Sequence, residues 1–266
     1  MLALFAAFMA LPLVYTVSTA FKPIDELFLF PPRFFARRPT TRNFADLMVS
    51  LRNSAVPFSR YIFNSVFITA ATTVGHIVLS AMCAFPLAKH NFKMRGVIFQ
   101  MIVLSLMFSP FVIGIPRFML MSKSGMLNGY QSLILPGLAG SLGLYLLKQF
   151  MEQVPDSVLE SARIDGASEM RALWAIVMPM VKPAWLTLIL LSVNATWNDG
   201  YSAALYIHNE SMKPMALLQN YIQQAGIIRA GATSAFSLLM LLPPIVTFTL
   251  SQSNVIETMK SSGIKE

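Results

Sequence analysis

The stretch that decides the fold is Tyr61–Ala88, YIFNSVFITAATTVGHIVLSAMCAFPLA, which holds no Asp, Glu, Lys or Arg from end to end. About 20 mostly apolar residues are enough for a helix to cross the hydrocarbon core of a bilayer. Lipid offers no partner for backbone polar groups, so a segment of this kind must satisfy them internally, as a helix does. The stretch therefore predicts a transmembrane α-helix.

Apolar runs of similar length lie on both sides of this stretch. Spans are expected at residues 2–21, 61–86, 96–116, 126–147, 183–207 and 232–256. The first run resembles a signal peptide in hydropathy, but Lys22-Pro23 follows it and no small-residue cleavage site is evident. We expect it to be retained. The sequence thus predicts an all-α membrane protein with about six transmembrane helices, in a single domain over residues 1–266.

The composition supports a membrane protein. Hydrophobic residues make up 55% of the chain and charged residues 12%, whereas about a quarter of the residues in a soluble domain are charged. The net charge of +8 is expected beside lipid headgroups, and no basic run is interleaved with aromatics as on a nucleic-acid surface. Cys83 is the only cysteine, which excludes an internal disulfide, and we expect it to be a small buried residue.

Residues 155–183, PDSVLESARIDGASEMRALWAIVMPMVKP, carry the strongest local signals between the spans. Pro155 suits a first helical turn, and Ser157 and Glu160 have the spacing of a capping box. Gly166 can adopt the left-handed conformation that ends a helix. The pattern predicts a short helix, a tight turn and a second helix that leads toward the next span.

The second helix and the surface of this segment can also be read from the residues. Either Asp165 or Ser168 can start the second helix, and Pro179 and Pro183 mark the approach to the next span. Carboxylates four residues apart are expected to share a helix face, and they occur at Asp156 with Glu160 and at Asp165 with Glu169. Leu159 and Ala162 form an apolar face, and the small residues Ser161, Ala162, Gly166 and Ala167 allow a partner to approach closely. The segment therefore predicts a docking surface.

The same residues resemble the E-A-A-x3-G-x9-I-x-L-P loop of binding-protein-dependent ABC importers. Glu160-Ser161-Ala162, Gly166 and Ile176-Val177-Met178-Pro179 fit it in register, with Ser161 replacing alanine and Met178 replacing leucine. The resemblance implies a type I ABC importer permease fold, with a cytoplasmic coupling helix between spans four and five, inside the coupling loop 148–182. The residues it assigns to ATPase coupling are Glu160, Ser161, Ala162, Arg163, Asp165, Gly166, Ile176 and Pro179.

The resemblance also implies partners. These are a second homologous permease subunit, two ATP-binding-cassette ATPase subunits, an extracytoplasmic solute-binding protein and the lipid bilayer, with no nucleic acid. The chain has no G-x-x-x-x-G-K-[ST] loop, so we expect ATP and Mg to bind the ATPase subunits and expect no cofactor, metal or catalytic residue on this chain.

Orientation follows from the loop and from the basic residues. With both termini inside the cell, nine of the 20 basic residues lie inside and eleven outside. Seven of the eleven fall in residues 22–60, and without that segment the count is nine against four, as the positive-inside rule expects. If the coupling loop is cytoplasmic, both termini also lie inside the cell. We therefore expect a multi-pass protein of the cell membrane with both termini cytoplasmic.

Further along the chain the resemblance narrows to the carbohydrate branch. Phe21-Lys22-Pro23, Asn194–Asp199 (NATWND) and the tail from Gln252 are similar to that branch, although Ser253, Asn254 and Glu257 depart from it. Trp197 offers a stacking surface and Asn198 and Asp199 offer hydrogen bonds, a combination that suits a sugar. The three are expected in the substrate pathway. The alternative is that Trp197 is an interfacial anchor and Asp199 lies just outside the membrane core.

Other residues in the spans favour packing, and other functions fit less well. His76 is expected to be a packed, hydrogen-bonded helix residue, and Gly137, Gly140 and Gly143 to allow close helix packing. A permease for a non-sugar solute remains an alternative. An ion-coupled carrier would show broken spans, several buried charges and a repeat. A membrane enzyme would need paired catalytic groups within the spans, where only His76 and Asp199 are found.

Overall fold

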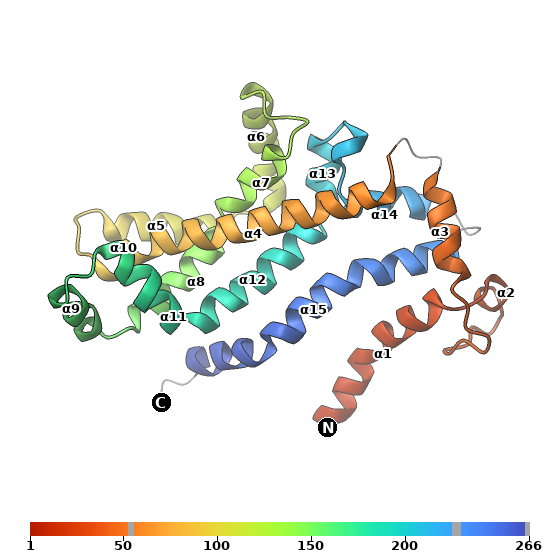
Figure 1. The fold of residues 1–266 in the computed structure, drawn as a ribbon, viewed down its shortest axis with the longest axis horizontal. Coiled ribbons are helices and arrows are strands. Elements are labelled where there is room, and N and C mark those ends of the chain that lie inside the picture. Colours follow the sequence, from red (N-terminus) through yellow and green to blue (C-terminus); the bar gives the residue numbers. More distant parts are fainter. Residues whose placement is uncertain (53–55, 225–229, 264–266) are drawn as a thin grey trace. The chain divides into compact units, whose positions relative to one another are not determined.

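The chain is helical wherever its structure is described. The computed structural model describes residues 1–52, 56–224 and 230–263 and places no strand among them (Figure 1). The chain divides into two compact units. The first comprises Met1–Val66 and Trp197–Ile245, and the second Phe67–Thr196 and Val246–Glu266. The single domain expected over residues 1–266 stays a prediction.

The first unit has a core of aromatic and aliphatic side chains. Its elements are α1 (Leu2–Ala20), α2 (Ile24–Leu27), α3 (Arg42–Arg52), the start of α4 (Phe58–Lys89), α13 (Gly200–Tyr206), a 3₁₀ turn (Glu210–Met212), α14 (Met215–Gln224) and the first part of α15 (Ala230–Gly263). Trp197 and Phe236 are at most 5% exposed in this core. Asn64 of α4 donates hydrogen bonds of 2.9 Å to the carbonyls of Ser211 and Lys213, which fixes the 3₁₀ turn against α4.

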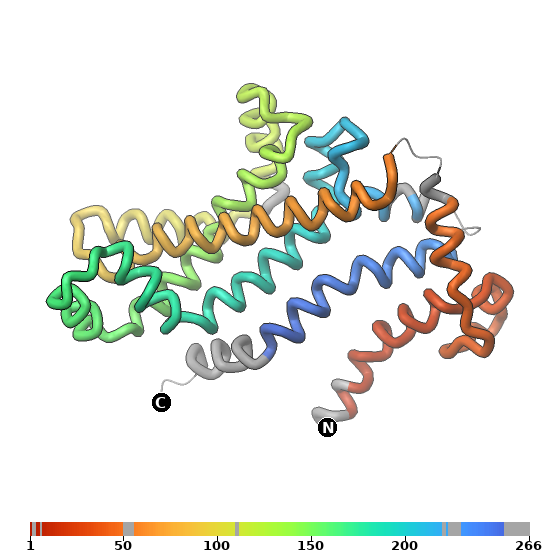
Figure 2. Tube along the Cα trace, in the orientation of Figure 1, coloured from red at the N-terminus to blue at the C-terminus, as the bar shows by residue number. Residues whose placement is uncertain are grey.

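The second unit holds the remainder of α4 and the helices that follow it. They are α5 (Arg95–Ser105), α6 (Pro110–Lys123), α7 (Gln131–Leu138), α8 (Ser141–Glu152), α9 (Asp156–Ile164), α10 (Glu169–Arg171), a π-helical turn (Ala172–Val177), α11 (Met178–Met180) and α12 (Lys182–Trp197). Its core includes Leu147, Leu173 and Leu188, each at most 2% exposed. Figure 2 traces the chain from α8 through α9 and back along α10 to α12.

Three helices in the described part of the chain are long and apolar enough to cross a membrane. They cover Phe58–Lys89, Gln131–Glu152 and Ala230–Gln252. A fourth crossing is obtained if Glu169–Met180 and Lys182–Trp197, which are bent by 82° to each other, form one broken span. Two shorter apolar helices, Ala7–Ala20 and Arg95–Ser105, accompany them. The six predicted spans are therefore confirmed only as a multi-helix apolar architecture.

Two of the expected spans are not continuous helices, which corrects the sequence reading, and a third is only interrupted. The run 96–116 is divided between α5 and α6, because Pro110 begins a new helix and holds Ser109 in an extended conformation. The run 126–147 is interrupted before Ser141, where Gly140 is extended (φ −69°, ψ 109°), but Gln131–Glu152 still forms one of the three candidate spans. The run 183–207 is divided because α12 ends at Trp197 and α13 starts afresh. Apolar composition marked these runs, but local capping and proline decided where helices begin.

His76 is packed and hydrogen-bonded inside the second unit, as expected. Its Nε2 lies 2.9 Å from the carbonyl oxygen of Gly140, and its Nδ1 lies 2.9 Å from the hydroxyl of Ser192. A carbonyl oxygen only accepts, so Nε2 donates and Nδ1 accepts from the serine. A Cβ at Gly140 would lie 2.5 Å from the imidazole, and one at Gly143 would also overlap this ring. The small residues therefore allow α7 and α8 to approach α4 closely, which confirms the glycine prediction.

The expectation for Cys83 is wrong, and the expectation for the C-terminal tail stays a prediction. Cys83 is exposed on α4 rather than buried, which corrects the expectation. A thiol behaves as a small apolar group, so it is suited to an exposed position on an apolar helix as well as to a core position. The carbohydrate-branch pattern of the tail continues past Gln252, and its side chains from residue 253 onward lie outside the part that the structure describes.

Candidate functional site

The predicted docking segment forms a helical elbow, defined here as residues 156–171. Helix α9 ends in a Schellman motif, in which Ala167 N–H donates to the Ala162 carbonyl at 2.9 Å and Gly166 N–H to the Arg163 carbonyl at 3.0 Å. Gly166 has φ +80°, a conformation that strains an L-residue. The glycine therefore sets the turn, as the sequence predicts.

The second helix begins at the position that Ser168 marks. Its side chain accepts a hydrogen bond of 3.3 Å from Arg171 N–H and so caps the helix. Helical structure then runs through the π-helical turn to Met180, and the chain bends at Val181 into α12. Trp185 Nε1–H donates 3.0 Å to the Met178 carbonyl across this bend. A side-chain hydrogen bond thus bridges the bend.

Two local predictions for the elbow are wrong. The Ser157–Glu160 capping box does not form, because Pro155 occupies the cap position and Ser157 lies inside α9. A proline side chain offers no acceptor, so the helix starts without a side-chain cap. The pair Asp165 and Glu169 does not share a helix face, because Asp165 ends α9 and Glu169 starts α10.

One face of the elbow is buried and the other is exposed. Leu159 is 3% and Ala162 7% exposed, and Leu159 packs in the core of the second unit. The exposed side chains and backbone include most residues predicted to couple to the ATPase, namely Glu160, Ser161, Arg163, Asp165, Gly166 and Pro179. The structure therefore exposes these residues, and the buried side of α9 is fixed in the core by Leu159. Ile176 is half-buried.

The sequence reading missed Ile164 and Met170, which are 86% and 52% exposed. Both are large apolar residues that flank the Gly166 turn, and exposed apolar groups beside polar ones mark interaction surfaces. The available signal was an isoleucine between Arg163 and Asp165, at the last position before the helix end. These two residues add an apolar component to the exposed surface of the elbow.

The start of the elbow is tied to the end of α4. Lys89 Nζ donates 2.7 Å to the Asp156 carboxylate and 2.5 Å to the Val154 carbonyl. The hydrogen bond from Lys89 and its positive charge lower the pKa of Asp156 below 3.8. Asp156 is therefore ionised at neutral pH and holds α9 against the last turn of α4.

The far side of the elbow turn has a second set of charges. Arg163 donates 3.0 Å to Glu169, and His90 Nε2 lies 3.3 Å from the same carboxylate. The hydrogen bond from Arg163 is the main cause of the lowered pKa of Glu169, and the Arg163 charge and His90 add to it. Glu169 thus links the two helices of the elbow and reaches the basic turn 89–95.

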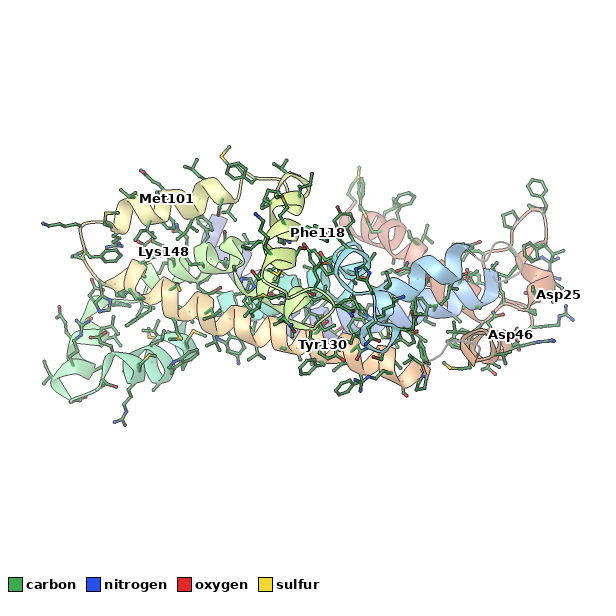
Figure 3. The ribbon with its side chains drawn as sticks, turned by 90° about the horizontal axis from the view of Figure 1, so that it is seen from above. Asp25, Asp46, Met101, Phe118, Tyr130 and Lys148 are labelled. Carbon is green, nitrogen blue, oxygen red and sulfur yellow. The ribbon has the colours of Figure 1, made fainter. Side chains whose placement is uncertain are left out.

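The basic turn itself is fixed to α8. Arg95 donates 2.9 Å to Glu152, and Lys148 forms an ion pair of 2.7 Å with the same carboxylate. The Lys148 ammonium also lies 3.8 Å from the centre of the Phe99 ring, a cation–π contact. Figure 3 shows Lys148 on α8 beside α5, the helix that carries Met101. These contacts make α5, α8 and the basic turn one support for the elbow.

A hollow of about 390 Å³ opens between the two arms of the elbow. Small side chains, Ser161, Ala162, Ala167 and Ala175, leave this space, and Asp165 and Arg171 lie at its polar rim. A bulky side chain from another protein would fit there beside either charge. The small residues that the sequence reading singled out therefore create a receptive hollow.

The three residues predicted for the substrate pathway lie together in the first unit. Trp197 is 5% exposed, and its Nε1–H donates 3.1 Å to the Met240 carbonyl. Asp199 caps α13, accepting 2.9 Å from Ser202 N–H. Asn198 is exposed between them. The pathway role stays a prediction, and the geometry gives Trp197 and Asp199 a part in holding the turn that presents Asn198.

Acidic, histidine and cysteine side chains do not gather elsewhere in a way that suggests a metal centre. Among the described residues, no group of three or more is arranged to hold a metal ion. Among the described residues, Glu210 is the remaining carboxylate with a shifted pKa. Burial raises it, but hydrogen bonds from Lys213 and Tyr61 and the Lys213 charge outweigh burial and lower it overall. Glu210 is thus an ionised structural anchor.

Comparison with known proteins identifies the family to which the chain is related. Residues 76–260 match the family described as the binding-protein-dependent transport system inner membrane component. The chain is 32% identical to the sn-glycerol-3-phosphate transport system permease protein UgpE of Yersinia enterocolitica over an alignment of 202 residues. This alignment covers 75% of this chain and 72% of UgpE. It is 28% identical over 230 residues to the polygalacturonan/rhamnogalacturonan transport system permease protein YtcP of Bacillus subtilis, covering 86% and 77%.

The fold has a counterpart of known structure. It matches a chain in the crystal structure of a bacterial ABC transporter involved in the import of the acidic polysaccharide alginate, with a TM-score of 0.81. The match covers 95% of this chain and 92% of that chain at 22% identity. The match confirms the expected permease fold, and the matched family region contains the elbow and most of the apolar helices. The chain belongs to the binding-protein-dependent transport system inner membrane component family.

Proposed function

We propose that this chain is one of two permease subunits of an ATP-driven importer and forms half of its translocation pathway. The observation that carries the proposal is the elbow, whose glycine-closed tip is exposed while Leu159 and Ala162 beneath it are buried. An element that is exposed at its tip and buried at its base can receive a force from an adjacent protein and transmit it to the packed helices. No catalytic group is needed for this role.

The elbow would couple the ATPase to the helices. An ATPase subunit would contact Glu160, Ser161, Arg163, Asp165 and Gly166, with one of its side chains in the hollow beside Ala162. Movement of the elbow would reach α4 through the Lys89–Asp156 contact and α12 through the helix that ends at Val181. Ile176 and Pro179 lie on that second route. Coupling of this kind needs a shared rigid body, since packed interiors transmit strain.

The proposed topology has six membrane crossings and places the elbow on the cytoplasmic side. We assign crossings to α1, α4, the α5–α6 pair, the α7–α8 pair, α12 and α15, with both termini and the coupling loop 148–182 cytoplasmic. Support comes from the lengths of α4 and α15 and from the basic residues of the turn 89–95, which favour the inner side. Residues 22–60 would then lie outside.

The proposed partners are a second permease, two ATPase subunits that bind ATP and Mg, and an extracytoplasmic solute-binding protein. The family description supports dependence on a binding protein. The chain has no phosphate-binding loop of its own, so the nucleotide would bind elsewhere in the assembly. The ion-coupled alternative predicts broken helices, which do occur here, but the family match favours the ATP-driven class.

The proposed solute is a carbohydrate or a related polyol, with a non-sugar solute as the alternative. Support comes from the names of the relatives, which specify sn-glycerol-3-phosphate and polygalacturonan/rhamnogalacturonan. Asn198, exposed at the end of α12, would contact the solute, while Trp197 and Asp199 shape the turn around it. The partner permease and the binding protein would share the recognition.

Purification of the tagged chain from its own cells tests the proposal. Mass spectrometry of the co-purified proteins should identify a second permease of this family, an ATP-binding-cassette protein and a solute-binding protein in defined ratios. Isolation of the intact chain as a homo-oligomer without any nucleotide-hydrolysing subunit would contradict it. Binding of candidate saccharides to the co-purified binding protein then identifies the solute class.

A further inference from the structure

An apolar groove of about 500 Å³ runs along the surface of the second unit, away from the elbow tip. One wall is α4, and the other is formed by the helix before the Val181 bend together with α12. The lining of the groove includes Ile77, Val78, Trp174, Lys182, Trp185 and Ile189. The groove shares Pro179 and the helix before the Val181 bend with the coupling route, but the coupling proposal assigns no ligand to it.

The bend at Val181 shapes the groove. The two helices that meet there are bent by 82°, which opens space on one side of the joint. Trp185 is held in place because its Nε1–H donates to the Met178 carbonyl at 3.0 Å, so its ring forms a fixed wall. Trp174, on the other arm, is 39% exposed. Two tryptophans therefore border the same apolar space.

Lys182 is the one charged residue among those that line the groove. Its side chain is exposed and forms no ion pair with a described residue. Tryptophan is typical of the boundary between hydrocarbon and headgroups, and basic pockets between membrane helices bind anionic lipid headgroups. The groove thus combines an apolar slot with a single cation at its end.

We propose that this groove is a binding site for one anionic phospholipid, with the headgroup phosphate on Lys182 and an acyl chain against Val78, Trp185 and Ile189. Lys182 and Ile189 are two helical turns apart, about 10 Å, so the slot can hold the part of an acyl chain nearest the headgroup. Lys182 is exposed and ends the loop assigned to the cytoplasm, so it lies at the headgroup level, where an anionic phosphate can reach it. An apolar helix of a partner protein, about 10 Å wide with side chains, would instead cover this charge and offer it no anion. The positive charge of Lys182 therefore favours an anionic lipid over a partner helix as the occupant of the groove.

A photo-crosslinking experiment tests the site. The purified transporter complex is reconstituted in phosphatidylcholine vesicles with a trace of phosphatidylglycerol that carries a diazirine on one acyl chain. After irradiation, peptide mapping should locate the adducts on the segments around Val78 and Trp185. Unlabelled phosphatidylglycerol should compete, while added phosphatidylcholine or inorganic phosphate should not. Lys182→Gln should reduce these adducts about fivefold, the effect of one basic residue near an anionic surface.

Matched variants separate a built site from general contact with the bilayer. Lys93→Gln removes an exposed lysine from the basic turn outside the groove and should leave the labelling unchanged, and Lys182→Arg should retain most of it. Equal labelling by a diazirine phosphatidylcholine, or the same yield in Lys182→Gln, would overturn the proposal. Labelling in the isolated chain but not in the complex would show that a partner subunit covers the groove, which also overturns it.

Discussion

Lys89, the last residue of α4, donates a 2.7 Å hydrogen bond to Asp156, the first residue of α9. The lysine side chain is 4% exposed and the aspartate side chain 78% exposed, so the contact reaches from the core to the surface. The same ammonium holds the Val154 carbonyl at 2.5 Å. One cation therefore joins a membrane helix to the elbow on which the proposed coupling depends.

This contact predicts a specific pH dependence. The pKa of Asp156 is lowered below 3.8 by Lys89, so its stabilising contribution is complete above the unfolded pKa and is lost as the pH falls through the folded pKa. Asp156→Asn should lower the Tm at neutral pH, and the difference from wild type should shrink below about pH 3.8. Thermal unfolding measured from pH 2 to 7 checks this, with Asp46→Asn as an exposed control. A Tm difference that is constant across that range would contradict the ionised contact.

Gly166→Val should reduce uptake while the protein still inserts and assembles. The φ of +80° at Gly166 is unfavourable for valine, so the turn between α9 and α10 should distort and the exposed surface should shift. Gly125→Val is the matched control, because Gly125 also has a positive φ (+65°) and open space around it but lies outside the elbow. ATP-driven uptake into liposomes should fall at least tenfold for the first variant and less than twofold for the second. Equal uptake by both would remove the elbow from coupling.

Gly140→Val should destabilise the second unit. A Cβ there would lie 2.5 Å from the His76 ring, and the imidazole is held by Ser192 and by the Gly140 carbonyl itself. Overpacking of this kind costs about 1–3 kcal/mol, so the Tm should fall by several degrees. Gly96→Val is the control, because nothing lies within 4 Å of its Cβ position. An unchanged Tm for Gly140→Val would show that α4 and α8 are not packed as described.

Trp197→Ala should weaken uptake of the transported sugar and also lower stability. The indole is buried and donates to the Met240 carbonyl, and loss of a buried tryptophan costs about 3–5 kcal/mol. Trp197→Phe retains much of the packing and should recover most of the stability. If the indole itself contacts the solute, the KM for uptake stays raised in Trp197→Phe at restored stability. A wild-type KM in that variant limits Trp197 to a structural role.

The sequence was most informative where one residue type has one structural use. Gly166 predicted the left-handed helix end, because few other residues serve that position. For the start of the next helix the sequence offered Asp165 or Ser168, and the structure selects Ser168. Ser157 misled, because a capping box requires that the cap residue lie one turn before Glu160, and Pro155 begins the helix two residues earlier. Spacing alone does not reveal which of two competing start signals is used.

Contacts between distant segments were beyond the reach of the sequence. Nothing in the pattern KHNFKMR indicates that Lys89 and His90 contact Asp156 and Glu169, because such pairs depend on how α4 and the elbow pack. The apolar runs were found, but their division at Pro110 was not, since hydropathy is insensitive to a missing N–H. Similarly, the sequence suggests a stacking surface at Trp197, and only the structure shows that the indole is 5% exposed and donates to the Met240 carbonyl.

Site-directed crosslinking from Ile164 tests the central claim most directly. Ile164 is 86% exposed at the tip of the elbow, and Phe30, in the segment assigned to the exterior, is 95% exposed. Each is replaced by cysteine in a Cys83→Ser background, and the intact transporter in membranes is treated with a short bifunctional thiol reagent. The account predicts an adduct between position 164 and the nucleotide-hydrolysing subunit, and none from position 30. An Ile164→Cys thiol that reacts with a membrane-impermeant reagent from the outside of intact cells, or that never reaches the ATPase, would contradict it.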